Sequence, residues 1–220
     1  MDNSDNYQDD MIEGKKIMHK AAPILKQLFA QVPNLFEKDV KIYPVEDQPG
    51  NVCNIMDKTC GIDYLIVSND KSKAVGLAWR TNRFWKARHR KSIVYNGFSL
   101  RQKRDNQYSK EENCEIQKRR TAIELGLMRP EFTAQADYDP DDDDEILCVA
   151  IARTDDIIEA YNKGMYRICD KNRTKNDVFM HDVQWERMKQ AGYPVYDWYA
   201  KDKYKGLYEP CVCDTTSDPF

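Results

Sequence analysis

The spacing of apolar residues predicts alternating helices and strands. Over residues 11–32 the apolar positions recur at steps of three and four, which is typical of an amphipathic helix. Shorter apolar runs at residues 40–45, 62–67 and 74–79 predict strands. A polar turn, SNDKSK, joins the last two runs, so we expect them to pair as a β-hairpin.

The second half of the chain continues in the same way. A polar helix is expected over residues 110–127, because Gly126 suits its end. Residues 93–100 read as a hairpin around Asn96-Gly97. Residues 132–138 alternate as a strand does, and residues 146–152 form a continuous apolar run that predicts a buried strand. The expected fold class is therefore α/β (α+β), with a mixed central sheet flanked by helices.

The domain organisation follows from length and local composition. A chain of 220 residues suits one main domain. Five segments are expected: a disordered N-terminus (1–10), a core (11–135), an acidic loop (136–145), a C-terminal αβ portion of the same domain (146–200) and an irregular tail (201–220).

Composition and cysteine usage predict a cytoplasmic protein. No apolar stretch approaches the ~20 residues of a membrane helix, so we expect no membrane association. The acidic, polar start does not resemble a secretory signal. Seven cysteines without regular spacing suit reduced thiols better than disulfides or a zinc site.

Positive charge is concentrated in one part of an otherwise acidic chain. The net charge is -3, yet residues 71–104 contain eleven Lys or Arg and no acid. Aromatic residues are interleaved with these cations, which suits phosphate neutralisation with base stacking. The residues expected to bind nucleic acid are Arg83, Lys86, Arg88, Arg90, Lys91, Arg101, Lys103 and Arg104. The alternative is a solvated face whose acidic partners lie elsewhere in the fold.

Two acids and an arginine are the candidate catalytic residues. Asp63 lies early in one predicted strand, Asp57 lies six residues before it, and Arg80 ends the neighbouring strand. Two carboxylates that bind Mg²⁺ beside a cation can cut a phosphodiester, because the metal activates water and the cation stabilises the developing charge. The alternative is that both acids cap turns and Arg80 pairs with a carboxylate structurally.

The segments GIDYLIV and VGLAWR, followed by FSLR and CEIQKRR, resemble the PD-(D/E)XK nuclease superfamily. They are more closely similar to a group of uncharacterised bacterial and phage proteins that carry a GID strand followed by an Ala-x-Arg strand. The resemblance covers about residues 11–135. It implies a restriction-endonuclease-like core, with a leading helix, a strand carrying an acid, a hairpin strand with the second half of the motif, a helix and a strand.

The same resemblance assigns positions within the motif. Asp63 stands at the first Asp, Ala78 at the place of the acid and Arg80 at the place of the Lys. Alanine cannot bind a metal. Either another acid such as Asp57 or Glu13 substitutes for it, or the protein has the fold without the cleavage.

Two functions are therefore expected from the sequence. The first is a metal-dependent endonuclease acting on DNA rather than RNA, with Mg²⁺ bound by Asp57 and Asp63. The second is a non-catalytic phage or mobile-element factor that binds nucleic acid or a protein partner, for example as a host-defence inhibitor. Nucleotide-triphosphate, acyl-transfer and dinucleotide motifs are absent from the sequence.

Overall fold

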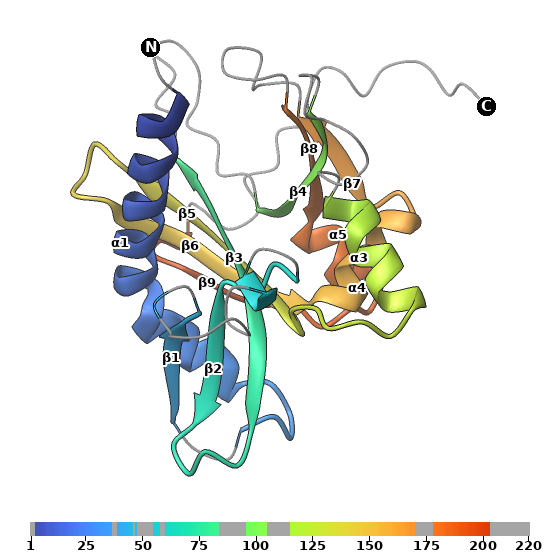
Figure 1. Cartoon of the computed structure of the whole chain (residues 1–220), viewed down its shortest axis with the longest axis horizontal. Helices are drawn as coiled ribbons and strands as arrows, with labels where there is room; N and C mark the ends of the chain where they lie inside the picture. Colours follow the sequence, from blue (N-terminus) through green and yellow to red (C-terminus); the bar gives the residue numbers. More distant parts are fainter. Residues whose placement is uncertain are drawn as a thin grey trace.

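The chain forms two β-sheets with helices around them (Figure 1). The computed structural model describes residues 3–36, 39–45, 47, 55–57, 60–83, 96–104, 115–169 and 178–202. Among the described helices, none combines the length and the apolar character needed to cross a bilayer.

The larger sheet has six strands in the order β1-β2-β3-β5-β6-β9. Strands β3 and β5 are parallel, and every other neighbouring pair in this sheet is antiparallel. The strands span Val40–Pro44 (β1), Tyr64–Ser68 (β2), Ala74–Arg83 (β3), Phe132–Asp139 (β5), Glu145–Arg153 (β6) and Tyr196–Tyr199 (β9). A mixed central sheet flanked by helices, as predicted, is confirmed.

The smaller sheet has three antiparallel strands in the order β4-β8-β7. These strands span Gly97–Arg104 (β4), Val178–Gln184 (β8) and Tyr166–Cys169 (β7). Strand β4 pairs with β8, far away in the sequence, whereas we predicted a local hairpin around Asn96. Residues 91–95, the other half of that predicted hairpin, lie outside the described residues.

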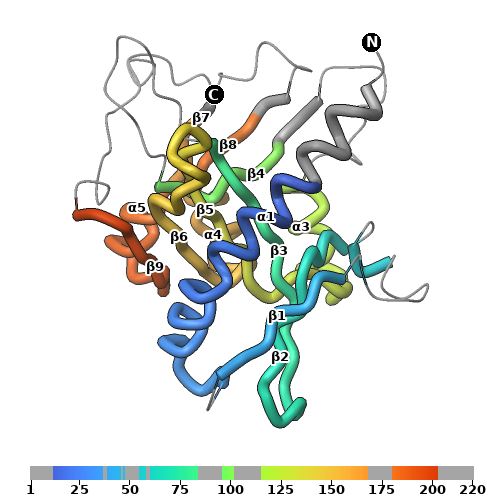
Figure 2. Tube along the Cα trace, turned by 90° about the vertical axis from the view of Figure 1, so that its left-hand side faces the viewer, coloured from blue at the N-terminus to red at the C-terminus, as the bar shows by residue number. Residues whose placement is uncertain are grey.

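Four helices of six residues or more surround the sheets in the described part of the chain: α1 (Asn3–Ala30), α3 (Glu115–Glu124), α4 (Thr154–Asn162) and α5 (Trp185–Gln190). Helix α1 packs one apolar face on the larger sheet and forms one core with it. Helices α3, α4 and α5 share a second core with the smaller sheet and with strand β6. Figure 2 shows the same arrangement from the side, with α1 running along the larger sheet.

Strand β6 separates the two cores. Its sequence EILCVAIAR is nearly all apolar because Val149 and Ile151 face the α1 core while Cys148 and Ala150 face the other. Strands β6 and β9 belong to the same sheet as β2 and β3, so the predicted core segment (11–135) and C-terminal portion (146–200) contribute to one sheet.

Two predicted segments are wrong in their extent. Helix α1 begins at Asn3, so residues 3–10 are helical rather than disordered; an acidic composition is also favourable near a helix N-terminus. The predicted acidic loop at residues 136–145 is shorter, because β5 continues to Asp139 and β6 begins at Glu145. Asp137 is only 2% exposed.

The acidic turn at residues 140–144 contacts helix α1. Lys16 pairs with Asp144 at 2.5 Å and Lys20 pairs with Asp143 at 3.2 Å. Part of the charge on this turn is thus balanced by lysines of α1.

Packing of α1 on the sheet predicts a large loss for one substitution. Phe29 is 0% exposed and its ring centroid lies 5.4 Å from that of Phe132. Phe29→Ala should lower the free energy of unfolding by about 3–5 kcal/mol, measured by urea denaturation. Ile12→Ala on the same helix is the control: Ile12 is 67% exposed, so its loss should stay within about 0.5 kcal/mol. Equal losses would contradict this packing.

Candidate functional site

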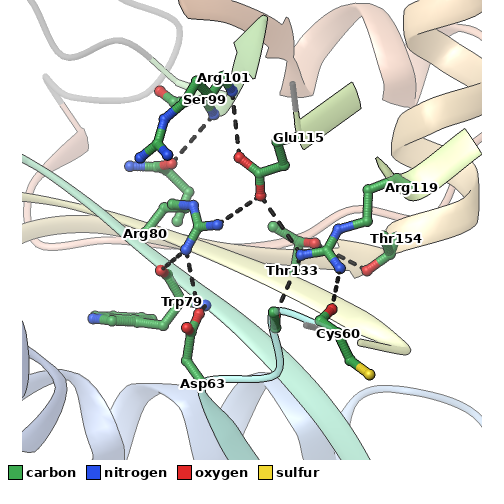
Figure 3. A network of polar contacts seen from close by, with 12 residues as sticks. Cys60, Asp63, Trp79, Arg80, Ser99, Arg101, Glu115, Arg119, Thr133 and Thr154 are labelled. Atoms are coloured by element: carbon green, nitrogen blue, oxygen red, sulfur yellow. Dashed lines mark hydrogen bonds and ion pairs between the residues drawn. The ribbon is translucent and has the colours of Figure 1, made fainter. Parts of the chain in front are cut away.

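Asp63 and Arg80 meet at one end of the β2-β3 hairpin (Figure 3). Asp63 directly precedes β2, and its backbone N–H donates to the carbonyl of Leu77 on β3 at 2.9 Å. Its carboxylate Oδ2 accepts from the backbone N–H of Trp79 at 2.6 Å and from Nη1 of Arg80 at 3.2 Å. The hairpin therefore brings the two residues into direct contact, as the motif prediction required.

Glu115 supplies a second carboxylate to the same guanidinium. It is the first residue of α3, its side chain is 12% exposed, and its Oε1 lies 2.6 Å from Nη2 of Arg80. Its other oxygen, Oε2, accepts the backbone N–H of Arg101 on β4 at 3.3 Å. Arg80 is thus held between two acids from separate elements.

Arg119, one helical turn after Glu115, extends the cluster. Its Nη2 lies 3.6 Å from Glu115 Oε1. Its Nη1 donates to the carbonyl of Cys60 at 2.5 Å and its Nη2 donates to the carbonyl of Gly61 at 3.2 Å. We refer to Asp63, Arg80, Glu115 and Arg119 as the charge cluster.

The charge cluster is balanced, with two carboxylates and two guanidinium groups. Burial raises the pKa of Asp63, an effect that the charge of Arg80 opposes only in part. Burial also acts to raise the pKa of Glu115, but the guanidinium groups of Arg80 and Arg119 bring it below its ordinary value. The charge of Glu115 raises the pKa of Arg80, whereas burial lowers that of Arg119. The environment therefore shifts the pKa values of the two carboxylates in opposite directions.

The remaining predicted catalytic residue, Asp57, does not join the cluster. It lies in a helical turn at residues 55–57, and its backbone carbonyl accepts the N–H of Gly61. Among the described residues, the ion pairs of Arg80 are those with Asp63 and Glu115.

Glu13, the other acid considered as a substitute at the motif, also lies elsewhere. It binds Arg83 and the hydroxyl of Tyr138, which belongs to the α1 core. Ala78 lies two residues before Arg80 on β3, hence on the same face of the strand, and it is fully buried.

The predicted nucleic-acid-binding residues fall into three groups. Arg83 pairs with Glu13, and Arg101 contributes its backbone N–H to the charge cluster. Lys103 and Arg104 lie on β4, where only the backbone is described. Outside the described residues lie Lys86, Arg88, Arg90 and Lys91.

A buried polar seam beside the charge cluster joins the two sheets. Gln135 on β5 accepts the backbone N–H of Ser99 at 3.3 Å, and the Ser99 hydroxyl donates to Asp182 on β8 at 2.6 Å. Asn82 on β3 donates to the same hydroxyl, and Arg167 on β7 pairs with Asp182.

Neither the seam nor the role of Glu115 is evident from the sequence. There, the three-residue spacing of Glu115 and Lys118 on a polar helix predicts only a surface ion pair. The alternation in FTAQADYD does place Gln135 and Asp137 on one face, but it does not reveal that a second sheet covers that face.

The chemistry of the cluster suits Mg²⁺ in part. Carboxylate oxygens are the ligands that Mg²⁺ prefers, and it often binds through only one or two of them together with substrate phosphates. Oδ1 of Asp63 accepts no hydrogen bond from the described residues, whereas both oxygens of Glu115 are engaged. Within the described ranges, no three His, Cys, Asp or Glu side chains are grouped so as to hold a metal ion.

Comparison of the chain with protein families, with curated proteins and with solved structures finds no match in any of the three.

Replacement of Glu115 should cost stability in a pH-dependent way. Glu115→Gln leaves the partly buried guanidinium of Arg80 and the buried one of Arg119 with one fewer charge partner, so the free energy of unfolding should fall by about 3 kcal/mol at neutral pH. Because the folded-state pKa of Glu115 is lowered, its stabilisation exists above the ordinary pKa and is lost as pH falls through the folded value. The difference from wild type should therefore shrink below about pH 4.5.

Urea denaturation between pH 3 and pH 8 measures this difference. Glu159→Gln is the control, because Glu159 forms an exposed ion pair with Lys163 and its loss should be much smaller at every pH. A Glu115→Gln effect that stays constant with pH would argue against a charge role for Glu115.

Two glycines with similar backbone conformations test how closely Arg119 packs against the turn at Gly61. Gly61 and Gly126 have φ angles of +65° and +63°, so alanine costs similar backbone strain at both, about 1–2 kcal/mol. A Cβ at Gly61 would lie 2.8 Å from Nη2 of Arg119, whereas at Gly126 it meets nothing within 4 Å. Gly61→Ala should therefore lower the thermal midpoint more than Gly126→Ala does; equal shifts would show that Arg119 yields without cost.

Proposed function

We propose that this chain is a nucleic-acid-binding protein of nuclease-like architecture that acts on DNA. The observation that carries the proposal is the 3.2 Å contact between Asp63 and Arg80. The order of elements also supports it: a leading helix α1, Asp63 at the start of β2, Arg80 on β3, then α3 and β5. That is the order which the resemblance to the PD-(D/E)XK superfamily implies.

Arg80 suits the binding of a phosphate group. A guanidinium carries five N–H donors. Three hydrogen bonds join Arg80 to Asp63, Glu115 and the carbonyl of Trp79, which leaves two N–H groups that bind no described residue. The side chain is 30% exposed and already fixed in place, so little conformational entropy is lost when a phosphate binds.

Mg²⁺ is the proposed cofactor, with Asp63 as its protein ligand. The ion, when bound, activates water and neutralises charge on the phosphate. The Arg80 guanidinium would stabilise the same charge. Asp57 is not proposed as a second ligand, because it lies outside the charge cluster.

A cleavage assay tests the nuclease proposal. Plasmid, single-stranded and duplex DNA, and RNA of the same sequence are incubated with the protein and Mg²⁺ or Mn²⁺. We expect DNA cleavage that needs metal and falls by about 100-fold or more in Asp63→Asn, since loss of one charge-stabilising group costs about that much. Asp47→Asn, at an exposed carboxylate paired with Lys15, should cleave as wild type does. No cleavage of any form by the wild type would contradict the nuclease proposal.

A second candidate function is binding without cleavage, to nucleic acid or to a protein partner. Ala78 favours it, because this buried residue offers no metal ligand where the motif has an acid. Engagement of both Glu115 oxygens by other donors favours it as well. Tight DNA binding by a protein that cleaves nothing would support this candidate. We propose a cytoplasmic setting for both functions.

Charge reversal in the basic run, residues 71–104, tests the binding of nucleic acid itself. Replacement of Arg88, Arg90 and Lys91 by Glu should weaken DNA affinity and flatten its salt dependence, with a change in slope of about 0.9 for each phosphate that the protein no longer neutralises. Fluorescence anisotropy between 50 and 300 mM salt measures both quantities. Replacement of Lys163 by Glu is the control, because Lys163 is an exposed lysine outside the basic run. Unchanged affinity in the triple variant would leave the binding proposal without support.

A further inference from the structure

Both halves of the Asp63-Arg80 pair are held by one helix. Glu115 binds the Arg80 guanidinium, and Arg119 binds the carbonyls of Cys60 and Gly61 in the turn that leads to Asp63 (Figure 3). Glu115 and Arg119 are four residues apart on α3, so they share one face of the helix. The helix therefore sets where β3 and the turn stand relative to one another.

Arg119 makes its hydrogen bonds with residues outside the pair, although its charge also acts to lower the pKa of Asp63. Its polar contacts within the described residues go to Glu115 and to two backbone carbonyls, not to Asp63 or Arg80. Its side chain is 7% exposed. Burial of a guanidinium this deep in the protein costs desolvation free energy. The hydrogen bonds that Nη1 and Nη2 of Arg119 donate offset that cost.

The turn is shaped to receive this side chain. Gly61 has a φ of +65° and no Cβ, and a Cβ would come within 2.8 Å of Nη2 of Arg119. The carbonyls of Cys60 and Gly61 are adjacent and face the two Nη atoms of Arg119, so the planar guanidinium can bind both at once. Lysine presents a point charge on a flexible stem and cannot reproduce this geometry.

We propose that Arg119 is a positioning residue that fixes Asp63 against Arg80 by anchoring the Cys60-Gly61 turn. This inference rests on the proposed function, because it assigns Arg119 a role in that same site. Without the anchor the turn is held by its backbone hydrogen bonds alone, among them those of the Gly61 and Asp63 amides, so the place of Asp63 beside the guanidinium is less closely fixed. A misplacement of about 1 Å at a reacting group costs on the order of 100-fold in rate.

The test uses Arg119→Lys and Arg119→Met in the full chain. Arg120→Lys and Arg120→Met are matched controls on the same helix, because Arg120 binds Asn162 and lies over the Tyr161 ring, outside the charge cluster. Three quantities are measured: kcat for DNA cleavage with Mg²⁺, the Kd for uncleaved DNA in Ca²⁺, and the hydrogen-exchange rates of the Gly61 and Asp63 backbone amides by NMR.

Both Arg119 variants should lower kcat by about 100-fold while Kd changes less than about twofold. Hydrogen exchange of the Gly61 and Asp63 backbone amides should be faster in both, because a loosened turn opens the hydrogen bonds from these amides to Asp57 and Leu77 more often. Arg119→Lys keeps the charge, so faster exchange there reports lost positioning rather than lost charge. The Arg120 variants should match wild type in all three quantities.

Each outcome decides the inference. A folded Arg119→Lys protein with the wild-type kcat and wild-type amide exchange at Gly61 and Asp63 overturns it, and a lower thermal midpoint with neither change assigns Arg119 a purely structural role. If the wild type cleaves no DNA, the nuclease proposal fails and the amide exchange alone decides. If both Arg119 variants fail to fold, Gly61→Ala carries the test: the Asp63 amide should exchange faster there and not in Gly126→Ala, and equal rates overturn the inference.

Discussion

The packing of Arg80 between Asp63 and Glu115 is the constraint on which the rest of the site depends. A partly buried guanidinium needs compensating charge, and here three elements provide it or hold it in place: the start of β2, strand β3 and the first turn of α3. Removing any one of these leaves an unbalanced charge between the two layers. The ion pairs therefore link hydrogen bonding within the hairpin to the packing of α3 over the sheet.

Local pairing could be predicted from the sequence, and long-range pairing could not. The contact of Asp63 with Arg80 follows from two strands joined by a short polar turn, because an antiparallel hairpin places its neighbours side by side. Glu115 reaches Arg80 only because α3 lies in the connection between the parallel strands β3 and β5, and no short-range signal in the sequence places it there. For the same reason the pairing of β4 with β8 could not be predicted from the sequence.

Polar residues in strands were misread where both faces of a sheet are buried. Asp137 and Asp139 looked like the start of a solvated loop, yet both are buried on β5. Their acidity was taken as a sign of exposure because the sequence does not show that the smaller sheet and α3 cover this face. The same covering layer explains why side chains accept backbone N–H groups on the edge of β4 that faces away from β8: Gln135 accepts the N–H of Ser99 and Glu115 accepts that of Arg101.

The four-residue spacing of Glu115 and Arg119 has a consequence for how the gene can change. An α-helix advances about 100° per residue, so one inserted or deleted codon between them would turn one side chain away from the sheet while the other stayed. Loops elsewhere accept length changes at little cost. Descendants of this chain are accordingly free to vary in the length of their surface loops, but not in the number of residues between Glu115 and Arg119 on α3.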